Sequence, residues 1–332
     1  MAGKIVVGTV PFVNGLPLTW GLEDEPGVEV CRVAPSRMPG LLRAGRLDVA
    51  LLPAIAYFRL TAEGGERARA VPGGPAPPGR GVAAPRRSPA RPTEGPTGFV
   101  ALRAGAIGSR GEVGSVRLFG WTDIEKVRRV LLDASSRTSN TLARLLLVRR
   151  YGLRPHFVLP ESSEGPAASG AGEGGGSGGP APRPAGPAET KPGYAGRSPD
   201  AEVAIGDRGL RREPSLGRAP DWDRDLGLEW DRFVHKPFVY AFWVARQGAE
   251  VGRMAGVLAA ARERGLRDRE AIAVRAATET GIPLPVVRRY LLEQVSYDFG
   301  PREAKGLLVF YAMAAEEGLA PPGGRLRFAP DG

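Results

Sequence analysis

The sequence predicts an α/β protein in which strands and helices alternate and the strands pair mainly in parallel. Apolar runs of strand length recur along the 332 residues, for example at 4–10 and 238–246. Between them, apolar residues recur at the spacing of a helix face. Hydrophobic residues make up 42% of the chain, which is enough for a sizeable core in one large domain or in two lobes.

The apolar patterns place the elements in chain order. Strands are predicted at 4–10, at the start of 48–58, and at 127–134, 201–207 and 238–246. A helix is predicted at 35–47 with Ser36 as its N-cap, and another from Ser136 to about Arg150. From about Glu250 onward four helical segments are predicted, with glycines at their ends: Gly265, Gly281, Gly300 and Gly318.

Two segments break this pattern because they are rich in Pro, Gly, Ser and Arg. They are residues 73–97 and 161–199, the second of which contains GAGEGGGSGGPAPRPAG. Such compositions bury too little apolar surface to offset the entropy lost on ordering. We expect both to be disordered surface insertions that serve as plain linkers.

Three features limit the class of protein. The chain has no run of about 18 uncharged apolar residues, so no membrane span is expected. Its start, MAGKIVVGTV, lacks the apolar core and cleavage site of a secretory signal. A single cysteine, Cys31, excludes an internal disulfide framework. We therefore expect a cytoplasmic, soluble protein.

No metal or other cofactor is expected. His156 and His235 lie outside any cluster with metal-ligand spacing, and neither GxGxxG nor GxxxxGK[ST] occurs in the required context. The net charge is +10, but the basic residues are scattered arginines rather than one stripe. A positive field also attracts small anions, so we expect an anionic small-molecule substrate and no nucleic-acid partner.

The stretch LLDASSRTSNTLARLLL, residues 131–147, places hydroxyl side chains where a strand ends and a helix begins. They are Ser135, Ser136, Thr138, Ser139 and Thr141. The first N–H groups of a helix lack intrahelical partners, and the helix dipole is positive there. A single hydroxyl suffices for a cap, so this cluster favours a site for a carboxylate or phosphate.

Two further loops carry candidate polar side chains. Asn14, in TVPFVNGLPLTWGL, follows the first predicted strand, at the usual ligand end of an α/β sheet. Its amide is suited to binding a substrate oxygen, although asparagine also fixes turns through its own backbone. Ser115, in GAIGSRGEVGSVRLF, opens a predicted strand and either faces a cleft or belongs to a plain turn.

Asp207 ends the strand in AEVAIGDRGL, next to Arg208. An acid in this position is either an acid–base group or half of a structural ion pair. A neighbouring guanidinium lowers the pKa of a carboxyl and makes it a poor base. We therefore expect a structural ion pair between the two.

Several stretches, in this order, resemble chorismate dehydratase of the futalosine route to menaquinone. They are FVNGLPL, APSRMPGLLRAGRLDVALLPAIAY, IGSRGEVGSVRLF, LLDASSRTSNTLARLLL, AEVAIGDRGL, DLGLEWDRF and PFVYAFWVA, followed by the C-terminal YLLEQVSYDFGPREAKGLLVFYAMAAEEGL. The resemblance covers nearly the whole chain except the two insertions. It implies a two-lobed fold similar to type II periplasmic binding proteins, with an interlobe cleft. One lobe would contain residues 1–104 plus 240–332, and the other residues 105–239.

The resemblance also implies an activity and a site. The enzyme would be a lyase that converts chorismate to 3-[(1-carboxyvinyl)oxy]benzoate and water. Asn14 and Ser115 match catalytic or substrate-orienting positions, and Ser136, Thr138 and Ser139 match an S-x-T-S motif expected to hold a substrate carboxylate. This chain departs from the common pattern at Leu16, where many members have arginine, and at Ala54, where serine is common.

The loop with Asn14 and the hydroxyl-rich loop offer no His, Glu or Lys as a proton acceptor, so a carboxylate of chorismate itself is the expected base. Two alternatives stay open. One is an enzyme like 1,4-dihydroxy-6-naphthoate synthase of the same pathway, for which a histidine near the Thr-rich loop is expected. The other is a non-catalytic carboxylate-binding protein. The sequence leaves the oligomeric state open.

Overall fold

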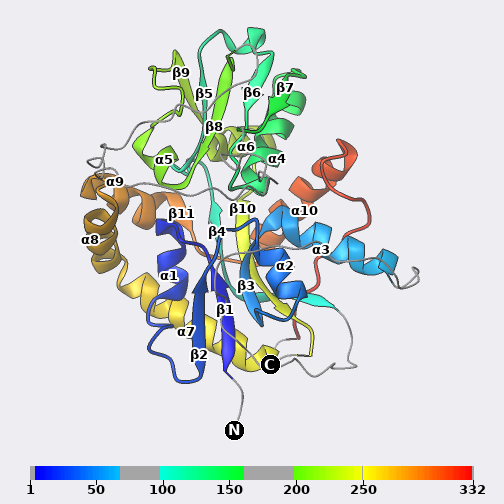
Figure 1. The fold of residues 1–332 in the computed structure, drawn as a ribbon, viewed down its shortest axis with the longest axis vertical. Helices are drawn as coiled ribbons and strands as arrows, with labels where there is room; N and C mark the ends of the chain where they lie inside the picture. The colour runs from blue at the N-terminus through cyan, green and yellow to red at the C-terminus, as the bar shows by residue number, and fades with distance from the viewer. Residues whose placement is uncertain (1–3, 68–97, 161–197, 249, 331–332) are drawn as a thin grey trace, which may run out of the picture.

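The described part of the chain folds into two mixed β-sheets with helices packed around them (Figure 1). The structure is a computed structural model that describes residues 4–67, 98–160, 198–248 and 250–330. We call the larger sheet with its helices the first lobe and the smaller sheet with its helices the second lobe. The predicted insertion at 73–97 lies outside the described residues, as does all but the end of the one at 161–199.

Each lobe contains one sheet. In the described residues, the first lobe has strand order β11-β4-β10-β3-β1-β2, built from β1 (Ile5–Thr9), β2 (Val28–Arg32), β3 (Val49–Pro53), β4 (Phe99–Ser109), β10 (Phe238–Arg246) and β11 (Val295–Ser296). The second has order β7-β6-β8-β5-β9, built from β5 (Val116–Gly120), β6 (Arg129–Leu131), β7 (His156–Val158), β8 (Ala201–Ile205) and β9 (Trp222–Asp225). The α/β class is therefore confirmed.

The prediction of mainly parallel pairing is wrong. β1 is parallel to β2 and β3, and β6 is parallel to β7 and β8, but β10 is antiparallel to both β3 and β4. The connectivity explains this. β4 carries the chain out of the first sheet and β10 brings it back from the second lobe, so the two must run in opposite directions (Figure 1). The exact predicted lobe boundaries stay a prediction.

The helices alternate with the strands in the first half and dominate the C-terminal part. They are α1 (Leu16–Thr19), α2 (Met38–Arg43), α3 (Ala54–Arg67), α4 (Arg137–Leu145), α5 (Gly206–Arg211), α6 (Leu226–Val234), α7 (Val251–Arg267), α8 (Arg269–Thr280), α9 (Leu284–Arg289) and α10 (Pro301–Glu316). Single π-helical turns extend α4 through Arg150 and α9 through Gln294. No helix in the described ranges is both long and apolar enough to cross a bilayer.

Two local predictions about these helices differ from the structure, one in the cap and one in the exact end. Ser36 does not cap α2, whose N-cap is Arg37 without a side-chain hydrogen bond. Proline at the start of α2 supplies the helical φ instead, and it has no N–H that needs a cap. Gly265 lies in the last turn of α7, which continues to Arg267, and the backbone of α1 leaves no room there for a larger side chain.

Replacing Gly265 by alanine is expected to lower the free energy of unfolding by about 2 kcal/mol. A Cβ at this position would lie 2.0 Å from the carbonyl oxygen of Pro17, so α7 and α1 would have to separate. Gly256 lies in the same helix with no atom within 4 Å of its Cβ position, so Gly256→Ala is the matched control. There we expect a gain of roughly 0.5–1 kcal/mol from helix propensity. Urea unfolding of both variants measures the difference, and equal stabilities would contradict the assigned close contact.

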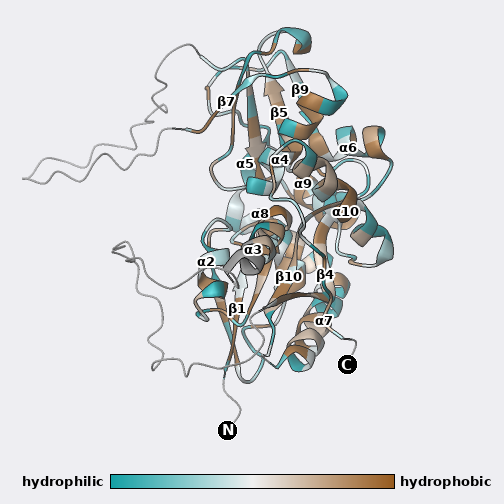
Figure 2. Ribbon diagram, turned by 90° about the vertical axis from the view of Figure 1, so that its right-hand side faces the viewer, coloured by the Kyte–Doolittle hydropathy of each residue, from teal (hydrophilic) through white to brown (hydrophobic). Residues whose placement is uncertain are grey.

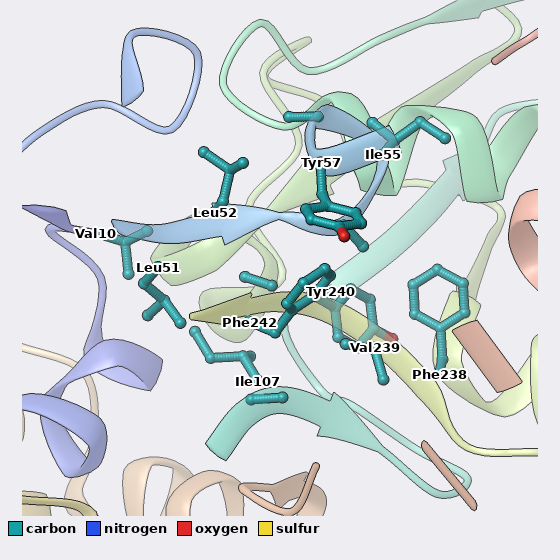
Figure 3. Packing of buried hydrophobic residues seen from close by; sticks show 14 of the residues in the cluster. Val10, Leu51, Leu52, Ile55, Tyr57, Ile107, Phe238, Val239, Tyr240 and Phe242 are labelled. Atoms are coloured by element: carbon teal, nitrogen blue, oxygen red, sulfur yellow. The ribbon is translucent and has the colours of Figure 1, made fainter. Parts of the chain in front are cut away.

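The core lies on both faces of the first sheet. Figure 2 shows β4 and β10 coloured mainly as hydrophobic, and every residue of β10 except its last is buried. Figure 3 shows Leu51 and Leu52 on opposite sides of β3, with Phe242 on the neighbouring strand β10. A strand buried on both faces needs an apolar run rather than alternation, which is why FVYAFWVA is recognisable in the sequence.

Candidate functional site

A cavity of about 60 Å³ lies where the two lobes meet. First-lobe loops and strands supply Val10, Phe12, Asn14, Pro35, Pro53, Ile107, Tyr240 and Ala241. The second lobe and the connection to it supply Val113, Ser115, Val116, Ser136, Ser139, Ile205 and Gly206. Small-molecule pockets usually measure roughly 300–1,000 Å³. In this structure the cavity is therefore smaller than such pockets, and the lobes would have to part to admit a ligand of that size.

The start of α4 brings two of the predicted hydroxyl groups to this cavity. Ser136 is the N-cap, and its Oγ accepts a hydrogen bond from the Ser139 backbone N–H at 3.2 Å. The Ser136 hydroxyl also donates to Ser139 Oγ at 2.9 Å. Both side chains line the cavity, so two hydroxyls and the positive end of a helix face the same space.

Thr138 lies in a different position from its neighbours. It is 1% exposed, it does not line the cavity, and its Oγ1 accepts a hydrogen bond from the Ile55 N–H at 3.3 Å. Ile55 belongs to the first turn of α3, so this bond connects the two lobes at the starts of two helices. Leu16 and Ala54, where the chain departs from the common pattern, do not line the cavity either.

Asn14 lies in a 3-10 turn, Val13–Gly15, directly after β1. A hydrogen bond from the Gly15 N–H to the Phe12 carbonyl closes the turn at 3.0 Å. The Asn14 side chain lines the cavity, and its Oδ1 is buried without a hydrogen-bond partner among the described residues. A buried amide oxygen without a partner is unfavourable, so it is a candidate acceptor for a ligand hydroxyl.

Ser115 precedes β5 and is 2% exposed. Its loop is fixed by Asp225, whose carboxylate accepts hydrogen bonds from the N–H groups of Val113 at 3.0 Å and Gly114 at 2.7 Å. Burial raises the pKa of Asp225, and these N–H donors together with Arg117 oppose the rise. The Ser115 hydroxyl accepts a hydrogen bond from Tyr290 at 2.9 Å.

Tyr290 is a part of the site that sequence reasoning missed. In the sequence it lies in an apolar helical stretch, where a tyrosine is expected to be an ordinary core residue. Its contact with Ser115 joins residues 175 positions apart, so no local pattern contains it.

The predicted ion pair between Asp207 and Arg208 is wrong. Arg208 instead pairs with Glu202 and Asp133. Both residues lie in α5, and successive helix positions point in different directions. Burial raises the pKa of Asp207, while Arg211 and the Val13 N–H oppose that rise. Asp207 does not line the cavity.

The cavity wall is mainly apolar, with a few polar groups and no charged side chain among the residues that line it. Its polar groups are the Asn14 amide, the Ser115, Ser136 and Ser139 hydroxyls, and the Tyr240 phenol. In the described residues, no group of three His, Cys, Asp or Glu side chains is arranged to hold a metal ion. Such a wall is suited to orienting an anion by hydrogen bonds and by the dipole of α4.

Three tyrosines close to this region make the protein sensitive to alkali. Burial raises the pKa values of Tyr240, Tyr290 and Tyr297 above the ordinary value of about 10. Above that pH the unfolded chain ionises while the folded protein keeps these phenols protonated. The free energy of unfolding is therefore expected to stay level below about pH 10 and to fall above it by about 1 kcal/mol per pH unit for each tyrosine. Urea unfolding across this range measures the slope, which should be shallower in Tyr297→Phe; an unchanged slope would contradict the assignment.

Comparisons with known proteins agree with this architecture. A family model described as menaquinone biosynthesis matches residues 5–63, 96–176 and 180–316. The structure of protein AF1704 from Archaeoglobus fulgidus is similar over 95% of this chain and 98% of its own, with a TM-score of 0.59 and 14% identity. The alkanesulfonate-binding protein SsuA from Xanthomonas axonopodis pv. citri, bound to MOPS, matches over 96% of this chain and 95% of its own, with a TM-score of 0.55 and 15% identity.

A third similar structure is the Candida albicans CA3427 gene product, described as having the generic periplasmic binding protein fold. It covers 100% of this chain and 99% of its own, with a TM-score of 0.53 and 10% identity. At such identities the likeness shows the fold alone. The predicted fold similar to periplasmic binding proteins is thereby confirmed.

Proposed function

The chain belongs to the menaquinone biosynthesis family, and on that premise we propose that it is a chorismate dehydratase, a lyase of the futalosine pathway that acts in the cytoplasm. The single observation that carries the proposal is the composition of the cavity wall. The Ser136 and Ser139 hydroxyls at the start of α4 line the same cavity as the Asn14 amide and the Ser115 hydroxyl.

The start of α4 supports binding of a carboxylate. A carboxylate there would accept hydrogen bonds from the Ser136 and Ser139 hydroxyls and gain from the positive end of the helix dipole. The similar SsuA structure is that of a protein that binds alkanesulfonates, which are also small anions. In this structure Thr138 would not meet that carboxylate, because it does not line the cavity and its Oγ1 accepts the Ile55 N–H.

The reaction removes one ring proton and the ring hydroxyl of chorismate, which leave together as water. The electron pair of the broken C–H bond enters the ring, the C–O bond breaks, and the ring becomes aromatic. In this proposal Asn14 and Ser115 orient the ring, the departing hydroxyl and the enolpyruvyl arm. The unpartnered Asn14 Oδ1 supports this role, since a hydroxyl of the substrate would supply the hydrogen bond that it lacks.

A proton acceptor is needed, and no residue that lines the cavity is an ionised acid, histidine or lysine. We infer that one of chorismate's own carboxylates takes the ring proton. Asp207 is the alternative proton acceptor, because it directly follows Gly206, which lines the cavity, and because burial raises its pKa. The substrate carboxylate is preferred because Asp207 itself is not on the cavity wall.

Incubation of the purified protein with chorismate tests the proposal, with the product followed by its aromatic absorbance and by mass. Conversion to 3-[(1-carboxyvinyl)oxy]benzoate is the expected result. Tight binding of chorismate without turnover would instead indicate a non-catalytic carboxylate-binding protein. Absence of both binding and turnover would favour an enzyme similar to 1,4-dihydroxy-6-naphthoate synthase.

A further inference from the structure

The phenol of Tyr290 reaches both candidate catalytic side chains. Tyr290 begins the π-helical turn Tyr290–Gln294 that continues α9, and it is 1% exposed. Its hydroxyl donates a hydrogen bond to Ser115 Oγ at 2.9 Å. The Asn14 side chain lies close enough to the same hydroxyl to lower its pKa. π-Helical turns often occur at functional sites, where they shift the direction of a side chain.

Asn14, Ser115 and Tyr290 come from three separate parts of the chain. Asn14 follows β1, Ser115 precedes β5, and Tyr290 follows α9. Asn14 and Ser115 line the cavity, but Tyr290 does not. Tyr290 therefore contacts the candidate catalytic groups from behind the cavity wall, where it can influence substrate only through them.

We propose that Tyr290 is a positioning residue that holds the Ser115 hydroxyl and the Asn14 amide in one fixed arrangement against the substrate. This inference deepens the proposed function and depends on it for its kinetic consequences. A serine hydroxyl rotates freely about its Cα–Cβ bond unless a partner fixes it. Because Tyr290 donates to Ser115 Oγ, the serine's own proton is directed elsewhere, and Ser115 itself lines the cavity.

The protonation state of Tyr290 suits this role. Burial raises its pKa well above the ordinary tyrosine value, and the charges of Asp207 and Asp225 act in the same direction. The hydrogen bond to Ser115 and the nearby Asn14 side chain oppose the rise without cancelling it. The phenol therefore keeps its proton, and hence its donor function, through the neutral range.

The chain offers a matched control in Tyr297. Tyr297 is also almost fully buried, at 3% exposure, but its hydroxyl has no hydrogen-bond partner among the described residues. Tyr290→Phe and Tyr297→Phe each remove one buried phenol oxygen and keep the ring. Only the first removes a contact with Ser115 and Asn14.

The test compares kcat and KM for chorismate in both variants. Tyr290→Phe is expected to lower kcat by roughly 10- to 100-fold, with KM changed by less than about threefold, because misplaced catalytic groups slow the chemical step more than binding. Tyr297→Phe is expected to keep the wild-type values. In a Ser115→Ala background, Tyr290→Phe should lower kcat much less than it does alone, since its main target is already absent.

Wild-type kcat in Tyr290→Phe would overturn the proposal, and so would a full additional loss in the Ser115→Ala background. Crystal structures of wild type and Tyr290→Phe give a readout that does not need turnover. A changed or multiple Ser115 rotamer supports the proposal, and an unchanged single rotamer overturns it.

If Tyr290→Phe fails to fold, p-aminophenylalanine at position 290 is used in its place. Retained kcat then supports the need for a donor, and lost kcat in a folded protein overturns the proposal. If wild type itself does not convert chorismate, the proposed function fails and the rotamers alone decide the inference.

Discussion

Replacing Asn14 by alanine is expected to lower kcat for chorismate by about 10²–10³-fold, the usual effect of removing one well-placed hydrogen-bonding group. Asn14 lines the cavity, and its buried Oδ1 has no partner among the described residues, so a bound substrate is the natural source of one. The carboxylate of the substrate would still meet Ser136 and Ser139. We therefore expect KM to change by less than about threefold, because the lost contact acts mainly in the transition state.

Steady-state kinetics and calorimetric titration with chorismate measure the two effects separately. Asn14→Asp is the informative second variant, since it keeps the size of the side chain while it replaces the amide by a carboxylate. We expect it to lose turnover as alanine does and also to weaken binding, because two like charges would share the cavity. Near-normal turnover in Asn14→Ala would contradict the catalytic assignment of Asn14.

The parts of this site that are local in the chain could be predicted from the sequence. Helix capping is decided within three or four residues, so the hydroxyls in SSRTS predict both the start of α4 and a polar helix end. Asn14 follows β1 directly, and the strand pattern of 4–10 is enough to place it at the ligand end of the sheet. Both inferences need only sequence neighbours.

The other parts depend on contacts between distant segments. The hydroxyl pattern does not reveal that Thr138 would meet Ile55 of α3, because that contact is set by how the two lobes close. Tyr290 meets Ser115 only because the C-terminal helices return to the junction between the lobes. The strand directions likewise follow from the route of β4 and β10 between the lobes, which local hydropathy does not encode.

The prediction of an ion pair between Asp207 and Arg208 shows the same division. Adjacent opposite charges in the sequence predict an ion pair, but in α5 the two side chains diverge. Arg208 then finds Glu202 and Asp133, which are already buried or nearly so and need a counter-charge. Secondary structure, rather than charge alone, decides which partner is within reach.

Replacing Ser136 by aspartate is expected to raise KM for chorismate by at least about 100-fold, with a much smaller effect on kcat. Aspartate is as good an N-cap as serine, so α4 should keep its start, and the helix dipole favours the new charge. The substrate carboxylate, however, would then face a negative charge in its own site. Two such charges about 4 Å apart near a protein surface repel by roughly 4 kcal/mol, which corresponds to roughly a thousandfold loss of affinity.

Ser136→Asn is the matched control, since asparagine has the size and the capping strength of aspartate without its charge. We expect it to raise KM by no more than about tenfold, the effect of exchanging one hydrogen-bonding group for another. The difference between the two variants isolates the charge of the ligand at the start of α4. Thermal unfolding should place both variants close to wild type. Equal KM values for the aspartate and asparagine variants would mean that no anionic group binds beside Ser136, and the cavity would then have to orient chorismate through Asn14 and Ser115 alone.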